Sequence, residues 1–254
     1  SSAASDVYKR QVYWWVDGIY FNVRLDDERQ CILVIVGAKE DGTKELVAVE
    51  DGFRESKESW QSVLRDLKRR GLKAGPKLAI GDGALGFWAA LAEEHHETKT
   101  QICWVHKTAN ALDKLPSSQQ GKAKKMIHDI YLAEKKEEAE KAFDDFINEF
   151  ELKYPKAVDS LRSNRAHLLN FYDFPAEHWC SIRSTNVIES TFATVRLRTK
   201  RTKGCGSRIA TLTMVFKLTQ SAQKRWHKLR GYDVIPKVIA GTKFEDGIEM
   251  QMAA

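Results

Sequence analysis

The run CILVIVGA, from Cys31 to Ala38, is almost continuously apolar and constrains the fold more than any other segment. A strand with one face in water alternates apolar and polar residues, so an unbroken run is typical of a strand buried on both faces. The β-branched and aromatic segment Val12 to Leu25 and the segment Glu45 to Glu50 also favour strands, and Asp41-Gly42 predicts a turn. Three strands joined in succession indicate an antiparallel meander.

Beyond the meander the pattern changes period. Ser56 to Arg70 predicts a helix that Ser56 caps, because its apolar residues recur at helical spacing. Lys77 to Ile80 predicts a short buried strand, Phe87 to Glu94 a helix, and Gln101 to Val105 a fifth strand. This order predicts an α/β fold with an RNase H-like core, in which helices cover a mixed five-stranded sheet.

From about Thr108 to Phe171 the strand signals disappear, and Ala133 to Phe150 carries its apolar residues on one helical face. We interpret this block as an all-helical scaffold inserted into the α/β pattern. Helical signals return at Thr185 to Arg198 and at Ile209 to Leu229. The expected divisions are a first part of the core at 12–107, an all-α insertion domain at 108–178, a last part of the core at 179–232, and a tail at 233–254.

Composition narrows the functional classes. No run of about 18 uncharged apolar residues occurs, and no basic segment followed by an apolar one opens the chain, so we expect neither a membrane span nor a secretory signal. The four cysteines form no CxxC pair and are expected to be reduced thiols. Ser1 to Gln11 is small and polar, which favours a disordered leader. The expected location is cytoplasmic, in association with the nucleoid.

Positive charge is concentrated near the end of the chain. The net charge is only +6, but the stretch from Ile182 to Arg230 holds twelve Lys or Arg against one acid, Glu189. A solvated helix surface usually mixes both signs, so this stretch predicts contact with a polyanion such as DNA or RNA. The twelve bases are Arg183, Arg196, Arg198, Lys200, Arg201, Lys203, Arg208, Lys217, Lys224, Arg225, Lys228 and Arg230.

Two aspartates stand out by their setting. Asp17 lies within the apolar run of the first strand, where a charge is costly to bury unless it is paired or binds a cation. The alternative is that the strand ends at Val16 and that Asp17-Gly18 is a turn. Asp82 follows a buried strand and lies between two glycines, which would let a ligand approach the backbone closely. The alternative there is an incidental Asp in a turn.

Glu189, the acid within the basic stretch, lies near the apolar face of its predicted helix. It is either a salt-bridge partner or a metal ligand beside a phosphate backbone. Together, two strand-end aspartates and this glutamate would supply the oxygen ligands that Mg²⁺ or Mn²⁺ prefer. Two such ions can activate the attacking oxygen and stabilise the leaving oxygen in phosphodiester chemistry.

Four segments carry a family resemblance. VDGIYFNVR, AIGDGALGFWAAL, CWVHK and STNVIESTFATVRLRTKRTKG resemble the bacterial Mutator-type transposases, the insertion-sequence 256 family. The resemblance implies a catalytic triad at Asp17, Asp82 and Glu189, which holds two Mg²⁺ or Mn²⁺ ions, and an all-α insertion before the glutamate. It also implies nicking at the ends of the element to free a 3′-OH, which then attacks another phosphodiester.

The resemblance also assigns secondary residues and partners. The family's Cys-x-x-His signature falls on Cys103 and His106, where local packing is favoured over half of a zinc site completed by His178 and Cys180. Implied partners are DNA, as element ends and target, and further copies of the chain in a homo-oligomer on DNA. The residues expected to contact DNA are Asn186, Arg196, Arg198, Lys200, Arg201 and Lys203.

Two alternative functions stay open at this stage. One is an RNase H-like nuclease that cleaves DNA without joining strands. The other is a transposase-derived DNA-binding protein without chemistry, which the intact Asp, Asp and Glu disfavour. Members of the family carry a substantial N-terminal region that recognises the terminal repeats, whereas here the first core strand begins almost at once. We therefore expect a catalytic region that lacks this DNA-binding part.

Overall fold

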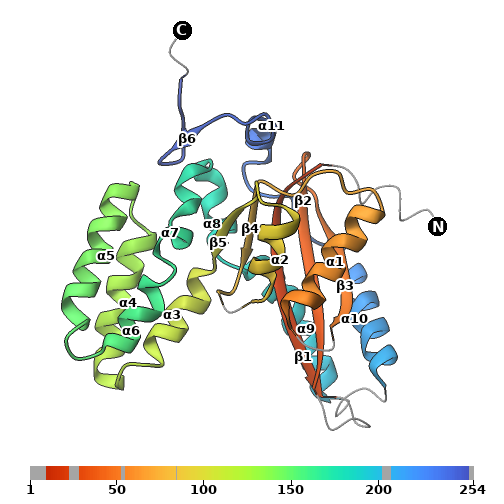
Figure 1. Ribbon diagram of the computed structural model, residues 1–254, viewed down its shortest axis with the longest axis horizontal. Helices are drawn as coiled ribbons and strands as arrows, with labels where there is room; N and C mark the ends of the chain where they lie inside the picture. The colour runs from red at the N-terminus through yellow and green to blue at the C-terminus, as the bar shows by residue number, and fades with distance from the viewer. Residues whose placement is uncertain (1–9, 23–28, 53–54, 84, 202–206, 252–254) are drawn as a thin grey trace.

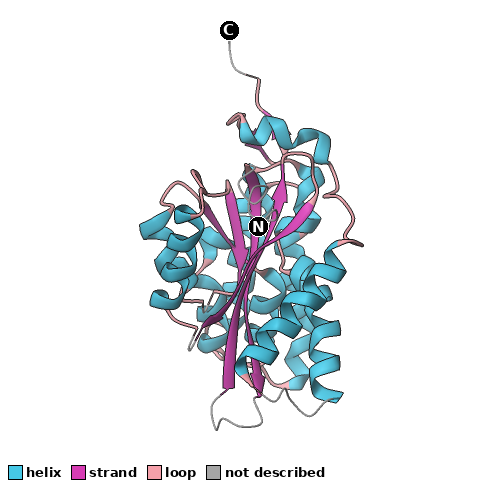
Figure 2. Ribbon diagram, turned by 90° about the vertical axis from the view of Figure 1, so that its right-hand side faces the viewer, coloured by secondary structure: helices cyan, strands magenta, loops and turns pink. Residues whose placement is uncertain are grey.

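The computed structural model describes residues 10–22, 29–52, 55–83, 85–201 and 207–251. At its centre, a five-stranded sheet carries helices on both faces (Figure 1; Figure 2). The strands are β1 (Gln11–Asn22), β2 (Arg29–Lys39), β3 (Lys44–Gly52), β4 (Leu78–Gly81) and β5 (Lys99–Ile102). Gln11, which the sequence placed in a leader, is the buried first residue of β1.

The strand order is β3-β2-β1-β4-β5. β1 pairs antiparallel with β2, and β2 with β3, whereas β1 pairs parallel with β4, and β4 with β5. The predicted mixed sheet is confirmed, with its antiparallel meander and two added parallel strands. This is the RNase H-like α/β arrangement.

Side chains alternate between the two faces of β1 because a strand has a period of two. Trp14 and Val16 pack toward α1 (Lys57–Arg69) and α2 (Phe87–Glu94), which cover one face. Trp15 and Ile19 belong to the core on the other face. The residue number along β1 therefore determines the face that a side chain occupies.

The opposite face is covered by the last two long helices, α9 (Asn186–Arg201) and α10 (Arg208–Gln223). Between β5 and α9 the described residues are helical and form a lobe beside the sheet (Figure 1). The elements of this segment are α3 (Trp104–Leu112), α4 (Ser117–Tyr131), α5 (Lys136–Phe150), α6 (Pro155–Arg162), α7 (Arg165–Leu168), the 3₁₀ turns Asn170–Asp173 and Ala176–His178, and α8 (Trp179–Ile182).

The final segment contains regular structure and packs on the rest of the protein. It holds the 3₁₀ turn Tyr232–Val234, α11 (Ile235–Ile239) and a small hairpin of β6 (Phe244–Glu245) and β7 (Ile248–Glu249). Gly247, at the hairpin turn, exchanges backbone hydrogen bonds with Ala176 and Tyr172, each at 3.1 Å. No helix in the described ranges has the length and apolar character needed to cross a membrane.

Two predicted element boundaries are wrong. The strand expected at 101–105 ends at Ile102, and α3 begins at Trp104. The neighbouring strand β4 ends at Gly81, whose carbonyl accepts a last hydrogen bond from the Cys103 backbone N–H at 2.8 Å. The residues after Cys103 therefore have no part of β4 beside them with which to pair. Trp104, which follows, is buried as part of α3 instead, whereas Val105 is exposed.

The helix expected to reach Leu229 ends at Gln223. The chain beyond it is held by long-range hydrogen bonds: Trp226 Nε1 donates to Thr191 Oγ1 at 3.0 Å, and the Leu229 backbone N–H donates to the Gly42 carbonyl at 2.8 Å. Leu229 is fully buried, so docking against the β2–β3 turn competes successfully with continued helix.

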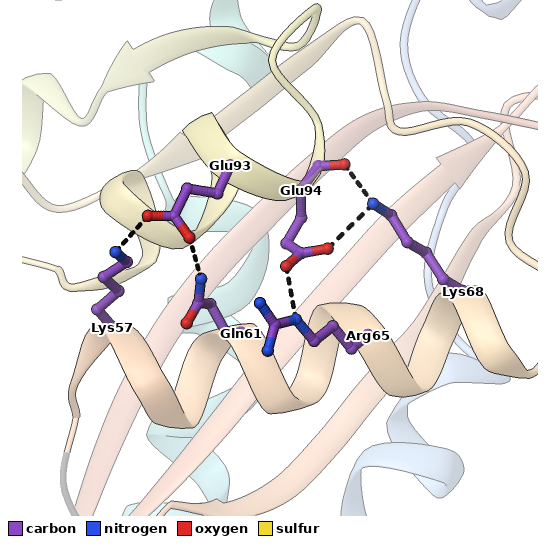
Figure 3. Close-up of polar contacts among 6 residues, drawn as sticks. All are labelled: Lys57, Gln61, Arg65, Lys68, Glu93 and Glu94. Atoms are coloured by element: carbon purple, nitrogen blue, oxygen red, sulfur yellow. Dashed lines mark hydrogen bonds and ion pairs between the residues drawn. The ribbon is translucent and has the colours of Figure 1, made fainter.

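A polar seam joins α1 to α2 (Figure 3). Glu93 and Glu94, at the end of α2, accept hydrogen bonds from donors spaced along α1, namely Lys57 and Gln61 for Glu93, and Arg65 and Lys68 for Glu94. Exposed ion pairs contribute little stability individually. The apolar contact beneath them, with Trp60 and Phe87 ring centroids 5.2 Å apart, therefore carries more of the packing energy.

We expect Phe192→Ala to lower the free energy of unfolding by about 3–5 kcal/mol, because it removes a fully buried ring between α9 and the sheet. Leu197→Ala, on the same helix but 63% exposed, is the matched control and should change stability by no more than about 0.5 kcal/mol. Guanidinium denaturation of both variants measures the difference. Equal effects would contradict the packing of α9 against the sheet.

Candidate active site

Asp17 lies in the middle of β1, where it pairs with Val34 of β2. The strand continues to Asn22, so the alternative of a turn at Asp17-Gly18 is wrong, as is the description of Asp17 as a strand-end residue. Its position along β1 places the side chain on the face of Trp15 and Ile19, which α9 covers. The residue is half-buried there.

Asp82 directly follows β4, the strand that pairs in parallel with β1. β1 and β4 pair in parallel as far as Trp15 opposite Ile80, and Asp17 and Asp82 each follow two residues later along their own chain segments. In-register residues of parallel strands share a face. Gly81 permits the close approach, since a Cβ there would lie 3.3 Å from the Val16 carbonyl oxygen. The parallel pairing therefore directs the chain at Asp82 toward the level of Asp17.

Glu189 is brought to the same face by α9. Ile188, Phe192 and Val195 bury one side of this helix against the core that includes Trp15. Glu189 lies in the first turn, where the positive end of the helix dipole favours a carboxylate. The three carboxylates thus come from β1, the end of β4 and the start of α9.

A hydrogen-bond network surrounds the Glu189 carboxylate. His106 Nε2 lies 3.2 Å from Glu189 Oε1, and Thr185 Oγ1 lies 3.2 Å from the same oxygen. The other ring nitrogen, His106 Nδ1, is 3.4 Å from Thr185 Oγ1. Cys103 Sγ lies 3.3 Å from both the backbone nitrogen and the hydroxyl of Thr185. The Cys-x-x-His signature, predicted to serve local packing, therefore contacts a predicted catalytic residue.

Within this network, His106 and Cys103 shift each other's pKa. The pKa of His106 is raised to about 9, and its hydrogen bond with Cys103 is the largest cause. Burial acts to lower this pKa, whereas the negative charges of Cys103, Asp82 and Glu189 act to raise it. Burial acts to raise the pKa of Cys103, but its hydrogen bond with His106 and the charge on that ring outweigh burial and lower it. His106 is therefore a cation close to both Asp82 and Glu189.

Two residues missed by the sequence reasoning lie over the loop after Asp82. A Cβ on Gly83 would lie 3.2 Å from Lys107 Nζ and 3.2 Å from Asn164 Oδ1. Lys107 comes from α3, and Asn164 from the junction of α6 and α7 in the helical lobe. Burial lowers the pKa of Lys107, while the charge of Asp82 acts to raise it. A signal for Lys107 was present, because helical spacing places it with Trp104 and Ala111 on the buried face of α3.

The expected DNA contacts are described only in part. Asn186 is exposed as the first residue of α9. The side chains of Arg196, Arg198, Lys200 and Arg201, and the whole of Lys203, lie outside the described residues.

Several of the described bases make contacts within the protein, and Lys228 lies over the Tyr232 ring, 4.8 Å from its centroid. Arg183 donates to the Tyr131 carbonyl at 2.9 Å, and Arg208 pairs with Asp51 at 3.0 Å. These two guanidinium groups are therefore engaged within the protein.

The residues of the discounted zinc site have other contacts. Both ring nitrogens of His178 are engaged, with Tyr13 Oη at 2.7 Å and the Gly231 carbonyl at 2.8 Å, whereas Cys180 is exposed. Over the described ranges, no three Asp, Glu, His or Cys side chains lie close enough together to hold a metal ion.

Comparison with known proteins decides the family. The model of the family described as "Transposase, Mutator family" matches residues 8–229. The chain belongs to the Mutator family of transposases. It is 56% identical over 223 residues to the transposase for insertion sequence element IST2 of Acidithiobacillus ferrooxidans, covering 88% of this chain and 75% of that protein. It is 53% identical over 236 residues to the transposase for IS6120 of Mycolicibacterium smegmatis, covering 93% and 73%.

A weaker likeness to a solved structure was also found. The HTLV-2 integrase catalytic core domain in complex with magnesium is 15% identical, with 48% of this chain and 86% of that chain covered at a TM-score of 0.27. The family membership establishes this chain as a transposase of insertion sequence elements.

We expect His106 to titrate with a midpoint of about 9 when its ring protons are followed by NMR. Because its folded pKa exceeds the ordinary value of 6.5, the stability that its charge contributes is complete below about 6.5 and is lost as the pH rises through about 9. Cys103→Ala should move the midpoint back toward 6.5 by more than Glu189→Gln does, because the hydrogen bond with Cys103 is the largest cause. His178, whose pKa burial lowers, serves as the internal control. A wild-type midpoint near 6.5 for His106 would contradict the network.

Proposed function

We propose that this transposase nicks DNA at the ends of its insertion element and joins the freed 3′-OH to a target phosphodiester. Asp17, Asp82 and Glu189 would be its catalytic carboxylates. The observation that supports the proposal is the parallel pairing of β1 with β4, because Asp17 lies two residues beyond the last residue pair on β1 and Asp82 two residues beyond it on the chain that leaves β4.

All three residues are carboxylates, the ligand type that a hard divalent cation prefers, although no three such side chains lie within metal-binding reach of one another among the described residues. Asp17, Asp82 and Glu189 would together hold two Mg²⁺ or Mn²⁺ ions. When bound, such ions activate the attacking oxygen and stabilise the leaving oxygen of an in-line displacement.

The protein's own groups would orient the reactants. His106 and Thr185 hold Glu189 Oε1 at 3.2 Å each and so fix the carboxylate on the active-site side of α9. The exposed Asn186 and the bases Arg196, Arg198, Lys200, Arg201 and Lys203 would meet the DNA backbone. Phosphoryl transfer depends mainly on such positioning and charge.

The nicking and joining reactions require two kinds of DNA, the element ends and the target. We propose that copies of the chain assemble as a homo-oligomer on the paired ends, where both DNAs can be held together.

The test is an assay of nicking and strand joining on DNA that carries the ends of the element, with Mg²⁺ or Mn²⁺. We expect Asp17→Asn, Asp82→Asn and Glu189→Gln each to lower both rates by about a thousandfold or more, because each removes several kcal/mol of transition-state stabilisation. Chelation of the divalent ions should abolish both reactions. Asp113→Asn, an exposed carboxylate at the end of α3, is the matched control and should keep the wild-type rates.

Each other outcome selects a different function. Metal-dependent nicking without joined product would favour an RNase H-like nuclease. Metal-independent binding of the same DNA, with wild type and variants equally inert, would favour a DNA-binding protein without chemistry. Full activity in any of the three carboxylate variants would remove that residue from the active site.

A further inference from the structure

Lys107 occupies an unusual position for a lysine. It lies on the inward face of α3 with Trp104 and Ala111, and only 8% of the residue is exposed. Lysine is almost never buried to this extent without an anionic partner, because removal of the ammonium from water is costly. A lysine kept at this site therefore indicates an anion that comes close to it.

The ammonium group lies beside the loop that holds Asp82. Gly83 makes this possible, since a Cβ on that residue would lie 3.0 Å from Lys107 Cε and 3.2 Å from Nζ. Asn164 Oδ1, from the helical lobe, approaches the same point at 3.2 Å. Asp82 is the acid whose charge acts on Lys107. If Asp82 serves a divalent ion, its charge is shared, and a phosphate bound there would bring further negative charge within reach of Lys107.

We propose that Lys107 donates a hydrogen bond to a backbone phosphate of the DNA strand that reacts at Asp82, adjacent to the phosphate under attack. The proposal rests on the proposed function, since it assumes that a DNA phosphodiester lies at Asp82. Lys107 then acts as a compact point charge on the strand, and Asn164 limits the space in which its ammonium can move. The helical lobe thereby contributes to the position of the reacting strand.

A structural ion pair with Asp82 is the competing explanation, and the two differ in their effect on the free protein. If Lys107 serves DNA, replacement by methionine, which keeps most of the apolar stem, should leave the melting temperature unchanged or raise it. If Lys107 serves the fold, the same replacement should lower the melting temperature, because it removes one partner of a buried pair.

The experiment measures binding of a fluorescent DNA duplex with the element's terminal sequence, without divalent metal, across a series of salt concentrations. We expect Lys107→Met to bind about tenfold more weakly or worse, as for the loss of a hydrogen bond to a charged group. The slope of log K against log salt should fall in magnitude by about 0.9, the value for one phosphate contact in duplex DNA. Lys107→Arg should keep most of the affinity. Lys156→Met, on the exposed side of α6, removes the same charge and should match wild type.

Two results would overturn the proposal. Wild-type affinity and slope in Lys107→Met would show that Lys107 contacts no phosphate. A lowered melting temperature in Lys107→Met, together with weak binding by Lys107→Arg, would assign it to the fold. Binding is measured without metal, so its result does not depend on the proposed nicking and joining. If the wild-type chain does not nick DNA but Lys107→Met still lowers the slope of log K against log salt, the phosphate contact stands and only the proposed chemistry is wrong.

Discussion

The parallel pairing of β1 with β4 is the constraint on which the candidate active site depends. Three residue pairs, ending at Trp15 and Ile80, fix both the level and the face at which the next in-register residues lie. Asp17 lies within β1 and Asp82 directly follows β4, and both strands are buried in the two hydrophobic cores of the sheet. The positional requirement on α9 is weaker than that on the strands. The helix needs only to pack its apolar side on the same face of the sheet to bring Glu189 toward the candidate site.

Carboxylates on one side of the sheet oppose folding if they come close together, and positive groups on that side offset this cost. Two neighbouring carboxylates repel, and a third adds to the repulsion. The amino end of α9, the cationic His106 and the ammonium of Lys107 all lie on this side of the sheet and provide positive charge. The same arrangement suits a site whose substrate is an anion, because the positive groups are available to it without rearrangement of the fold.

The mixed sheet and the helical character of the segment between β5 and α9 could be predicted because they follow from local patterns, whereas the expectation that Asp17 ends its strand was wrong. Asp17 was separable from a turn residue because apolar residues continue on both sides of it. The start of α3 could not be foreseen, since it depends on where β4 ends, a property of a distant segment. Thr185 and Asn164 were missed for the same reason: Thr185 meets His106 across 79 positions of chain, a contact that no local pattern encodes.

The two-residue period of β1 also limits how a transposase of this kind can change in length. Insertion or deletion of one residue within 13–17 would turn Asp17 to the face of Trp14 and Val16, where α1 and α2 exclude solvent. The lobe between β5 and α9 is under no such restriction, because it needs only to return the chain to Thr185 and to supply Lys107 and Asn164 at Gly83. Natural gain and loss of residues should therefore accumulate in the lobe while the strands keep a fixed length.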